Sequence, residues 1–315
     1  MKFVDAAEVH RLLDWPYAIE ALRQAHLGGL PQTGRAVLEE PRADGQPNVL
    51  ISVSAWQPGT ALGVKLVASF PGNVAEHALP TVNALYVLFD PETGVPHAVL
   101  DGEALIFRKT ATDSALGSAL LSRPDARTLL MIGAGAIAPY LIGAHRTARP
   151  SLDTVLIWNR TVPRAEKLAE QLRQEGVRSH AIADLDEALG VADIVSAATM
   201  TETPLIKGAL LKPGTHVDLV GAFRPTMREA DDDTVRRARL FCDTTDCITR
   251  SGELRIPLHA GIITRDKIEG DLFDLCGGKI PGRQSGTDIT LYKNGSGGHI
   301  DLFVASSLDR RLTGR

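Results

Sequence analysis

The stretch of sequence that decides the fold is Thr128–Arg149, TLLMIGAGAIAPYLIGAHRTAR. Leu129–Ile132 is a short apolar run typical of a strand, and the residues after the GAGAIA turn carry an apolar stripe at helical spacing. In a G-x-G-x-x-A turn, Gly133 lets the chain leave the strand sharply, Gly135 lets the backbone approach a pyrophosphate, and Ala138 lets the helix pack closely on the strand. The pattern predicts a dinucleotide-binding βαβ unit whose phosphates bind at the helix N-terminus.

A second predicted strand, Thr154–Trp158, ends in Asn159, Arg160 and Thr161, about twenty residues after the glycine turn. In NAD-binding units an acidic residue at this place holds the ribose 2′-hydroxyl. Here Asn159 donates hydrogen bonds and Arg160 offers a charge-assisted fork to a 2′-phosphate, so the sequence predicts NADPH as the cofactor, with NADH as a second option. The alternative is that Asn159 or Thr161 caps the helix that begins near Pro163.

The composition fits a globular protein of two domains. The chain has 315 residues, 44% of them hydrophobic, and its formal net charge of −4 without a basic block gives no support for a nucleic-acid surface. No apolar run reaches membrane-spanning length and the first residues lack the apolar core of a signal peptide, so we expect a cytoplasmic protein. Cys242, Cys247 and Cys276 show no metal spacing, and we interpret them as reduced thiols packed as small apolar side chains.

The first part of the chain predicts an α+β domain, because several strands follow one another before any βαβ unit. The expected helices and strands are Asp5–Leu13, Pro16–Leu27, Arg35–Glu39, Asn48–Trp56, Ala61–Phe70, Thr81–Phe89 and Pro96–Leu100. His26 lies on the buried stripe of the second helix, where a satisfied core histidine is expected rather than a ligand.

The second part alternates strands with helices. After a helix from the N-cap Asp101 to about Leu121 and the glycine-turn unit, we expect strands at 179–182, 193–197, 216–220 and 239–242 and helices at 163–174 and 185–189. This alternation predicts a Rossmann-like, doubly wound α/β sheet. A strand at 289–293 and a helix at 297–312 complete the chain, and the helix can return to the first domain. We therefore expect one domain of residues 1–120 and 296–315 and a second of residues 121–295.

Two cations in the first domain stand where apolar side chains are expected. Lys65 lies in the strand ALGVKLVASF, which is apolar on both faces, so its ammonium needs an anion or a water-filled cleft. Arg108 falls on the core stripe of its helix, with Lys109 at the border, and a carboxylate or phosphate is its expected partner. The alternatives are an edge strand from which Lys65 reaches solvent and an internal ion pair of Arg108, for instance with Asp113. Together the two cations predict a small carboxylate substrate.

Other active-site patterns do not occur in the sequence. There is no nucleophile elbow with a Ser/His/Asp order, no P-loop and no histidine pair at metal-binding spacing. The sequence therefore gives no support for a hydrolase or a metalloenzyme, and we predict no metal site.

Ten short motifs extend over nearly the whole chain: GVK at 63–65, FPGN at 70–73, LPTV at 79–82, FDPETGVP at 89–96, RKTA at 108–111, IGAGAIA at 132–138, AT at 198–199, VGAFRP at 220–225, EAD at 229–231 and ITLYKN at 289–294. In residue type and order they resemble the ornithine cyclodeaminase/μ-crystallin family. The ordered series is far more specific than any single motif.

The resemblance implies a homodimer whose first domains, the substrate-binding and dimerisation domains, pair, while each second domain binds NADP(H). It implies that Lys65 and Arg108 are the catalytic candidates and that they hold the substrate carboxylate near the nicotinamide together with Arg35 and Gly295. The cofactor-lining residues that it implies are Thr81, Gly133, Gly135, Ala136, Ile137, Asn159, Arg160, Thr161, Thr199, Val220 and Asn294.

One position departs from the cyclodeaminases of this family. They carry a catalytic aspartate in the loop after the strand that matches 216–220, and Phe223 stands there in this chain. The segment 48–56 also contains no acid, so no carboxylate is available to handle the δ-amine of ornithine. The runs at 107–116 and 221–229 resemble instead the ketimine reductase branch, which reduces Δ1-pyrroline-2-carboxylate and Δ1-piperideine-2-carboxylate.

The resulting hypothesis is hydride transfer from NADPH to the C=N carbon of a cyclic ketimine carboxylate, giving proline or pipecolate. Arg35 and Arg108 would clamp the carboxylate, and Lys65 would contact it or supply the proton that makes the imine electrophilic. The alternatives are an alanine-type amino-acid dehydrogenase, an ornithine cyclodeaminase and an NADPH-binding, crystallin-like protein without turnover. One methylene separates the five- and six-membered imines, which is too little for the sequence to choose between them.

Overall fold

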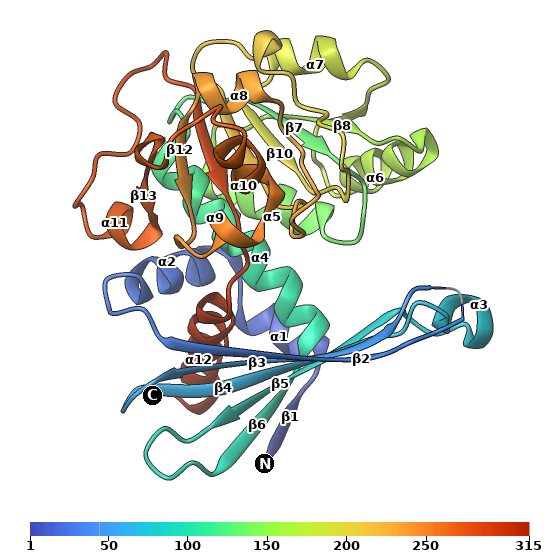
Figure 1. The fold of residues 1–315 in the computed structure, drawn as a ribbon, viewed down its shortest axis with the longest axis vertical. Helices are drawn as coiled ribbons and strands as arrows, with labels where there is room; N and C mark the ends of the chain where they lie inside the picture. The colour runs from blue at the N-terminus through green and yellow to red at the C-terminus, as the bar shows by residue number, and fades with distance from the viewer. Residues whose placement is uncertain (44, 315) are drawn as a thin grey trace. The chain divides into compact units, whose positions relative to one another are not determined.

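The computed structural model describes residues 1–43 and 45–314 (Figure 1). It contains two compact units, residues 1–109 with 297–315, and residues 110–296. The division falls inside helix α4 (Gly102–Leu121), whereas the sequence placed it after residue 120. Both units combine helices with strands, and the expected α/β class with a separate α+β unit is confirmed.

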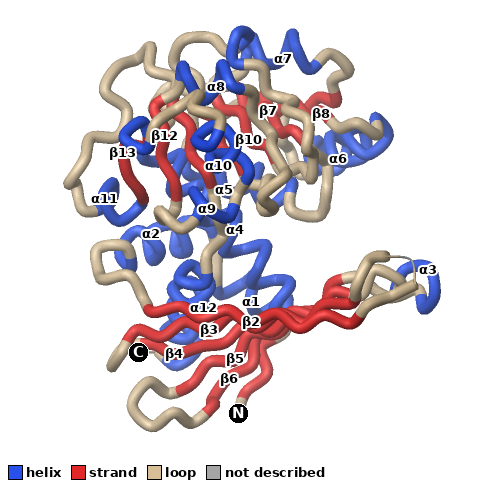
Figure 2. The backbone as a smooth tube through the Cα atoms, in the orientation of Figure 1, coloured by secondary structure: helices blue, strands red, loops and turns tan. Residues whose placement is uncertain are grey.

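The first unit is a six-stranded sheet with helices on one face (Figure 2). Its elements are β1 (Lys2–Val4), α1 (Ala6–Leu12), α2 (Trp15–Ala25), β2 (Gln32–Glu40), β3 (Asn48–Gln57), β4 (Ala61–Ser69), α3 (Asn73–His77), β5 (Val82–Phe89), β6 (Pro96–Asp101), the start of α4, and α12 (Gly298–Thr313). The strand order is β1-β6-β5-β4-β3-β2, with β1 parallel to β6 and all other neighbours antiparallel. Helix α12 packs across β2 to β5, α1 packs on β6, and α2 packs on α12.

The register of this sheet places two of the expected site residues in one row. Arg35 on β2 faces Val53 on β3, Val53 faces Lys65 on β4, and Lys65 faces Tyr86 on β5. Residues directly opposite one another in antiparallel strands point to the same face. Because β4 lies between β3 and β5, the alternative that Lys65 stands on an edge strand is wrong.

The opposite face of the same sheet carries large apolar side chains that this chain leaves exposed. The exposed fractions are 67% for Leu38, 45% for Leu50, 47% for Trp56, 39% for Leu66 and 43% for Leu85. Leu38 faces Leu50 and Leu66 faces Leu85 across the strands, so these side chains lie on one surface. We call this surface the apolar sheet face.

The second unit is an eight-stranded, wholly parallel sheet with helices between its strands (Figure 1). Its elements are the rest of α4, β7 (Thr128–Ile132), α5 (Ala138–Ala148), β8 (Thr154–Trp158), α6 (Val162–Gln174), β9 (Ser179–Ala181), α7 (Leu185–Val191), β10 (Ile194–Ala197), β11 (His216–Leu219), α8 (Asp232–Arg237), β12 (Arg239–Cys242), α9 (Cys247–Arg250), α10 (Gly252–His259), β13 (Ile268–Asp271), α11 (Leu272–Cys276) and β14 (Thr290–Lys293), with short 3-10 helices at 208–210 and 265–267. The strand order is β13-β12-β14-β11-β10-β7-β8-β9. The order reverses between β7 and β10, and ligands of such sheets bind outside the carboxyl ends of the strands at this switch point.

The core of the second unit lies around its central strands. All residues of β10, β11 and β14 are buried, as expected for strands covered by helices on both faces. In the first unit His26 is 1% exposed and its Nδ1 lies 2.8 Å from the carbonyl oxygen of Leu22. Burial lowers the pKa of His26 to about 4, so the imidazole is a neutral side chain of the core, as expected. Cys242 and Cys247 are free and buried, whereas Cys276 is partly exposed.

Several short elements were not predicted from the sequence, namely β1, α3, α8, α9, α10, α11 and β13. Each has three to eight residues, too few for an apolar period to be read. Within residues 1–43 and 45–314, no helix combines the length and the hydropathy needed to cross a bilayer.

Candidate functional site

The glycine turn of the second unit has the geometry of a phosphate-binding loop. Gly133 has a φ of 106°, which L side chains rarely adopt, and a Cβ there would lie 2.8 Å from the carbonyl oxygen of Ala198. Its N–H donates to the carbonyl oxygen of Trp158 at 2.8 Å, so the turn is joined to the end of β8. Ala138 is fully buried at the start of α5, as close helix–strand packing requires.

The next residues leave room and hydrogen-bond donors for an anion. A Cβ on Gly135 would meet no atom within 4 Å, so the backbone at this residue borders open space. Within the described part of the chain, the N–H groups of Gly135, Ala136 and Ile137 have no intramolecular acceptor. Free N–H groups before a helix, at its positive end, suit a pyrophosphate. The residues present therefore fit a dinucleotide.

The end of β8 supports the turn and presents cations. The Asn159 side chain accepts a hydrogen bond from Ala134 N–H at 3.1 Å and donates to the carbonyl oxygen of Thr161 at 2.9 Å. Thr161 is the N-cap residue of α6, but its side chain forms no capping hydrogen bond. Arg160 and Arg164 are both exposed at this helix start. Asn159 thus braces the glycine turn rather than capping α6 with its side chain.

The loops after β10 and β11 are held by one buried carboxylate. Glu229 accepts hydrogen bonds from the N–H of Thr199 at 2.7 Å, from the Thr199 hydroxyl at 2.8 Å and from the N–H of Gly221 at 2.7 Å. A Cβ on Gly221 would collide with the backbone of Thr199, so the two loops are in close contact. Val220 lies between β11 and Gly221, and its N–H donates to Ala197. Glu229 therefore fixes two of the loops at the switch-point edge of the sheet.

Burial sets the protonation of this carboxylate. It raises the pKa of Glu229 to about 7, and the neighbouring carboxylate of Glu253 acts in the same direction, while Lys293 opposes both. Glu253 accepts hydrogen bonds from the N–H groups of Glu229 and Ala230 at 2.8 and 3.0 Å. Lys293 is 1% exposed and donates to the carbonyl oxygen of Leu219. The loops of this edge thus rest on an ionisable group that titrates near neutral pH.

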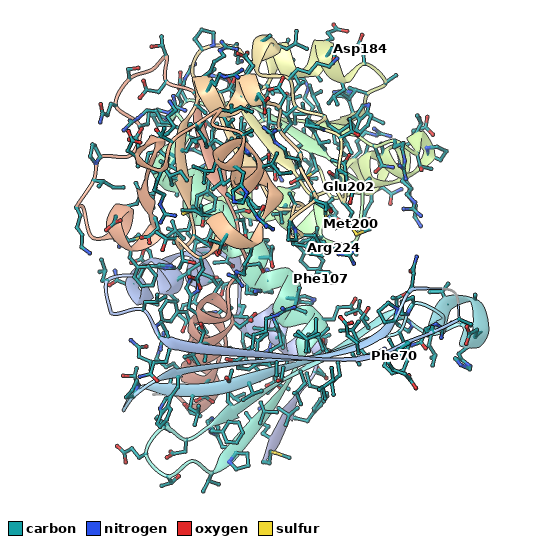
Figure 3. The ribbon with its side chains drawn as sticks, viewed as in Figure 1. Phe70, Phe107, Asp184, Met200, Glu202 and Arg224 are labelled. Carbon is teal, nitrogen blue, oxygen red and sulfur yellow. The ribbon has the colours of Figure 1, made fainter. Side chains whose placement is uncertain are left out.

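Three further loop residues can be followed in Figure 3. Met200 and Glu202 lie on the loop after β10, and Arg224 lies on the loop after β11. Glu202 accepts a hydrogen bond from Thr226 at 2.6 Å, which joins these loops a second time. Phe223, at the position of the cyclodeaminase aspartate, is 57% exposed.

Two other expected residues of this unit, Asn294 and Gly295, follow β14; Asn294 is buried and Gly295 is partly exposed. Asn294 is 1% exposed, and its amide donates to Thr110 at 3.0 Å and to Ser114 at 2.9 Å while accepting from the N–H of Ser296. A Cβ on Gly295 would lie 2.7 Å from the Asp243 carboxylate. These contacts give both residues a structural role at the end of β14.

The first unit holds an ion cluster around Asp301 of α12. Lys65 Nζ lies 2.7 Å from Asp301 Oδ2 and Lys109 Nζ lies 2.9 Å from Asp301 Oδ1. The side chains of Asp301 and Lys109 are each 1% exposed, and that of Lys65 is 12% exposed. Burial alone would raise the pKa of Asp301, but the two ammonium groups hold it below its ordinary value. The anion that Lys65 requires is therefore present in the chain itself.

Arg108 has different partners from those expected. Its Nε donates to Nδ1 of His10 at 3.0 Å, and its guanidinium lies 4.0 Å from the ring centroid of Trp15. Desolvation, and then the charge of Arg108, lowers the pKa of His10, so the imidazole accepts this hydrogen bond in its neutral form. Asp113, which the sequence offered as a possible partner of Arg108, accepts a hydrogen bond from the Tyr292 hydroxyl at 2.6 Å. Lys109, placed at the border of the core face by the sequence, is the fully buried member of the pair.

The remaining expected residues lie on the strands and loops of the first unit. Arg35 is exposed on the edge strand β2, in the row of Lys65. Thr81 lies just before β5, and its carbonyl oxygen accepts from the N–H of Phe70 at 2.8 Å. Sequence reasoning missed Asp301 and Glu229 as site residues. Glu229 stood in a recognised motif, but nothing in the sequence linked Asp301 to a lysine 236 positions away.

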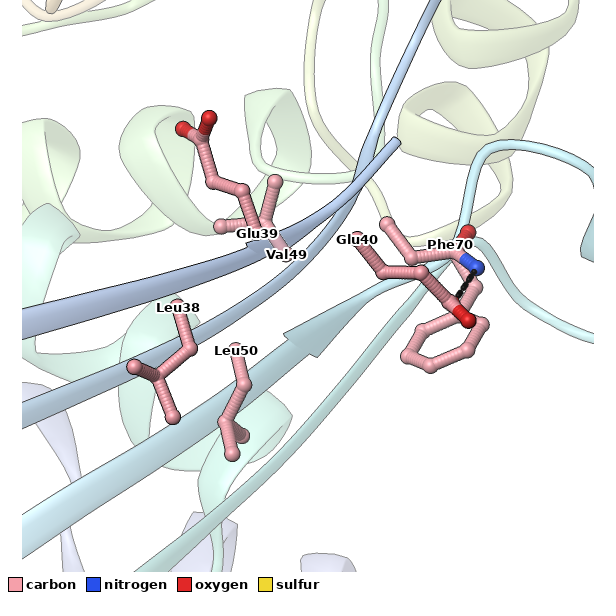
Figure 4. A pocket seen from close by; sticks show the side chains of 7 residues that line it. Leu38, Glu39, Glu40, Val49, Leu50 and Phe70 are labelled. Atoms are coloured by element: carbon pink, nitrogen blue, oxygen red, sulfur yellow. Dashed lines mark hydrogen bonds between the residues drawn. The ribbon is translucent and has the colours of Figure 1, made fainter. Parts of the chain in front are cut away.

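Two pockets are found within the separate units, and the second, of about 500 Å³, is lined by Pro225, Thr226, Arg255, Ile256, His259 and Ala260. The first, of about 180 Å³, lies on the first unit between Leu38, Glu40, Leu50 and Phe70, where Asn48 donates to Glu40 at 2.7 Å (Figure 4). Among residues 1–43 and 45–314 there is no group of three or more His, Cys, Asp or Glu side chains that could hold a metal ion.

The comparisons with known proteins agree on one family. A sequence profile described as the Ornithine cyclodeaminase/mu-crystallin family matches residues 3–306. A Delta(1)-pyrroline-2-carboxylate reductase of Paracoccus denitrificans (strain Pd 1222) is 41% identical over 316 residues, which cover 99% of this chain and 98% of the relative.

Two solved structures extend the comparison. Thermococcus litoralis Delta(1)-pyrroline-2-carboxylate reductase in complex with NADH and L-proline aligns with a TM-score of 0.90 and 27% identity, over 100% of this chain and 98% of the other. An archaeal alanine dehydrogenase dimer with bound NAD aligns with a TM-score of 0.89 over 100% and 96% of the chains, but at 23% identity it shows the fold alone. On the extent of these matches, the chain belongs to the ornithine cyclodeaminase/mu-crystallin family.

Proposed function

We propose that this chain is an NAD(P)H-dependent oxidoreductase that reduces the C=N bond of Δ1-pyrroline-2-carboxylate to give proline. The observation that carries the proposal is the 41% identity, over 99% of the chain, to the Paracoccus denitrificans reductase. The buried cations of the first unit and the phosphate-binding turn of the second support it, because the reaction needs an anion site and a dinucleotide site.

The chemistry divides between the two sets of residues. When bound, the reduced nicotinamide supplies a hydride to C2 of the ring. Lys65, Arg108 and Arg35 are the candidates for holding the substrate carboxylate, which orients C2 for attack. A proton on the ring nitrogen makes the imine electrophilic, and the ammonium of Lys65 is our candidate for supplying it. The product nitrogen retains this proton and the carbon gains the hydride, so the balance is one hydride and one proton per imine.

NADPH is the cofactor that we propose within this scheme. The end of β8 carries the neutral Asn159 where an acid would repel a 2′-phosphate, and Arg160 and Arg164 are exposed beside it. Guanidinium groups bind phosphate through paired, charge-assisted hydrogen bonds. The reductase of Thermococcus litoralis binds NADH, so NADH is the comparison cofactor in every assay.

We also propose that the working form is a homodimer paired through the apolar sheet face. Leu38, Leu50, Trp56, Leu66 and Leu85 expose a contiguous apolar surface in the single chain. Soluble monomers rarely leave such a surface open to water, and a second copy of the same face is complementary to it in a two-fold arrangement.

The test is a substrate panel with the purified protein. Oxidation of NADPH, followed by its absorbance, should be fast with Δ1-pyrroline-2-carboxylate, slower with NADH in its place, and yield proline in equal amount. Pyruvate with ammonia tests the alanine dehydrogenase alternative, and ammonia release from ornithine tests the cyclodeaminase. Turnover of pyruvate in preference to the cyclic imine, or no turnover at all, would overturn the proposal.

A further inference from the structure

We propose that Asp301 is a positioning residue for substrate binding by the first unit. Lys109 balances the charge of Asp301, and Asp301 orients the ammonium group of Lys65 toward the substrate. The inference rests on the proposed function for the identity of the substrate. The three side chains come from α12, α4 and β4, so the assignment depends on the fold and not on any one motif.

The two lysines contact Asp301 at similar distances but differ in exposure. Each oxygen of the Asp301 carboxylate contacts one ammonium group, at 2.7 Å for Lys65 and 2.9 Å for Lys109. Lys109 is 1% exposed and belongs to the interior, whereas the side chain of Lys65 is 12% exposed and reaches the surface. The buried Lys109 balances the charge of Asp301, and Lys65 is the member of the cluster that a ligand can reach.

The charges of Lys65, Lys109 and Asp301 do not cancel. By themselves these three side chains sum to +1 in a place largely removed from water. A net charge in such a place is costly unless another opposite charge compensates it. A monocarboxylate substrate carries one negative charge and can bind at Lys65, which is the accessible residue of the cluster.

The carboxylate also restricts where Lys65 can point. A lysine side chain has a flexible four-carbon stem and loses much conformational freedom when it is fixed. An ion pair to Asp301, itself held on a helix packed across β2 to β5, fixes the ammonium before any ligand binds. Preorganisation of this kind lowers the cost of binding.

A buried hydroxyl beside the cluster also supports a ligand-binding role. Tyr86 faces Lys65 in the sheet register and is fully buried, and its hydroxyl has no hydrogen-bond partner among the described residues. Burial, and then the charge of Asp301, raises the pKa of Tyr86 well above its ordinary value, so the hydroxyl keeps its proton. A Cβ on Gly63 would lie 2.5 Å from this oxygen, so glycine is needed there for the ring to fit. The groups around Asp301 are thus Lys65 on β4, Lys109 on α4 and Tyr86 on β5, while on the α2 side His26 lies against His299.

The test compares Asp301→Asn with the wild type in kcat, KM and pH profile. We expect KM for Δ1-pyrroline-2-carboxylate to rise about tenfold or more, because an orienting charged hydrogen bond is lost, and the alkaline limb of kcat/KM to move to lower pH. The Kd of NADPH should stay within about twofold, since the turn of the second unit is untouched. Asp309→Asn is the matched control, an aspartate of the same helix that pairs with His97 and should behave as the wild type.

A second variant and a second measurement keep the outcomes separate. If Asp301→Asn does not fold, the double variant Lys109→Met/Asp301→Asn restores the net charge of +1 and should fold with the shifted alkaline limb. Independently of any substrate, the 13Cε resonance of Lys65 in 13C-lysine protein should shift and sharpen when Asp301 is replaced, because the ammonium is no longer held in one position. An unchanged Lys65 resonance and an unchanged pH profile would overturn the role of Asp301. An inactive wild type with a changed Lys65 resonance would instead leave Asp301 in its place and overturn the proposed substrate.

Discussion

At the scale of single residues, each of three interior cations of the first unit is met by a second charge or by a ring. Lys109 and Lys65 share Asp301, and Arg108 combines a hydrogen bond to His10 with a stacking contact on Trp15. Each cation is held in one orientation by groups from other elements. The side chains that carry the proposed chemistry are therefore also part of the packing.

Arg108→Ala should lower kcat/KM for the imine by the equivalent of about 2–4 kcal/mol, because a charged hydrogen bond to the carboxylate is left unmade. Arg108→Lys should not recover the loss, since lysine has neither the planar fork nor the stacking surface for Trp15. Steady-state kinetics measure both effects, with Arg11→Ala, an exposed arginine of α1 beside Glu8, as the control. If the activity of Arg108→Ala stays within a few-fold of the wild type, Arg108 does not bind the substrate carboxylate.

Glu229 should make stability depend on pH. Its pKa is about 7 in the folded protein against an ordinary value of 4.5, so the folded state holds a proton that the unfolded chain releases between these values. The free energy of unfolding should therefore fall as pH rises through this window, by about 3 kcal/mol at most. Urea unfolding at pH 5, 6, 7 and 8 measures the slope. Glu229→Gln should flatten it and the exposed Glu166→Gln should not; equal slopes in all three proteins would contradict the prediction.

At the scale of elements, we propose that the segment between β8 and α6, residues 159–161, determines the preference for NADPH over NADH. Asn159→Asp keeps an oxygen to accept the Ala134 N–H, so the glycine turn should remain intact. The added negative charge repels a 2′-phosphate, and the preference for NADPH over NADH should fall about tenfold or more. KM values for the two cofactors measure the change.

Arg160→Ala tests the contribution of the positive charge between β8 and α6. The substitution should weaken the binding of NADPH about tenfold to a hundredfold and leave the binding of NADH nearly unchanged, because only NADPH carries the 2′-phosphate. Lys167→Ala, an exposed cation further along α6, is the control. Equal losses of affinity for both cofactors would show that Arg160 does not bind the 2′-phosphate.

Many elements with a clear apolar pattern were predictable, and contacts between distant elements were not. The strands Thr154–Trp158 and Arg239–Cys242 have the expected bounds, and Ala104 N–H donates to Asp101 at 2.9 Å, as an N-cap requires. The need of Lys65 for an anion also followed from its apolar neighbours. That the anion is Asp301 did not follow, because α12 is brought to β4 only by the complete fold. Lys109 was misplaced because its helix is buried on nearly all sides, and a single apolar stripe does not describe it.

At the scale of the whole molecule, the apolar sheet face should set the oligomeric state. Leu66→Glu places a charge in the middle of this face and should convert the dimer to monomers, because an unpaired charge cannot be buried there. Val191→Glu, a substitution at a residue 49% exposed in the second unit, should leave the dimer intact. Sedimentation velocity measures the species. A monomeric wild type, or a Leu66→Glu dimer as stable as the wild type, would rule out this face.

The first unit is built from both ends of the chain, and this determines the order in which the protein can be completed during synthesis. Lys65 and Lys109 leave the ribosome well before Asp301, and until then the sheet lacks both its covering helix and the counter-charge for its interior lysines. Residues 110–296 form a continuous unit that can fold as it emerges. The middle of the nascent chain can thus be completed before its beginning, and the N-terminal strands remain the longest without the helix that covers them.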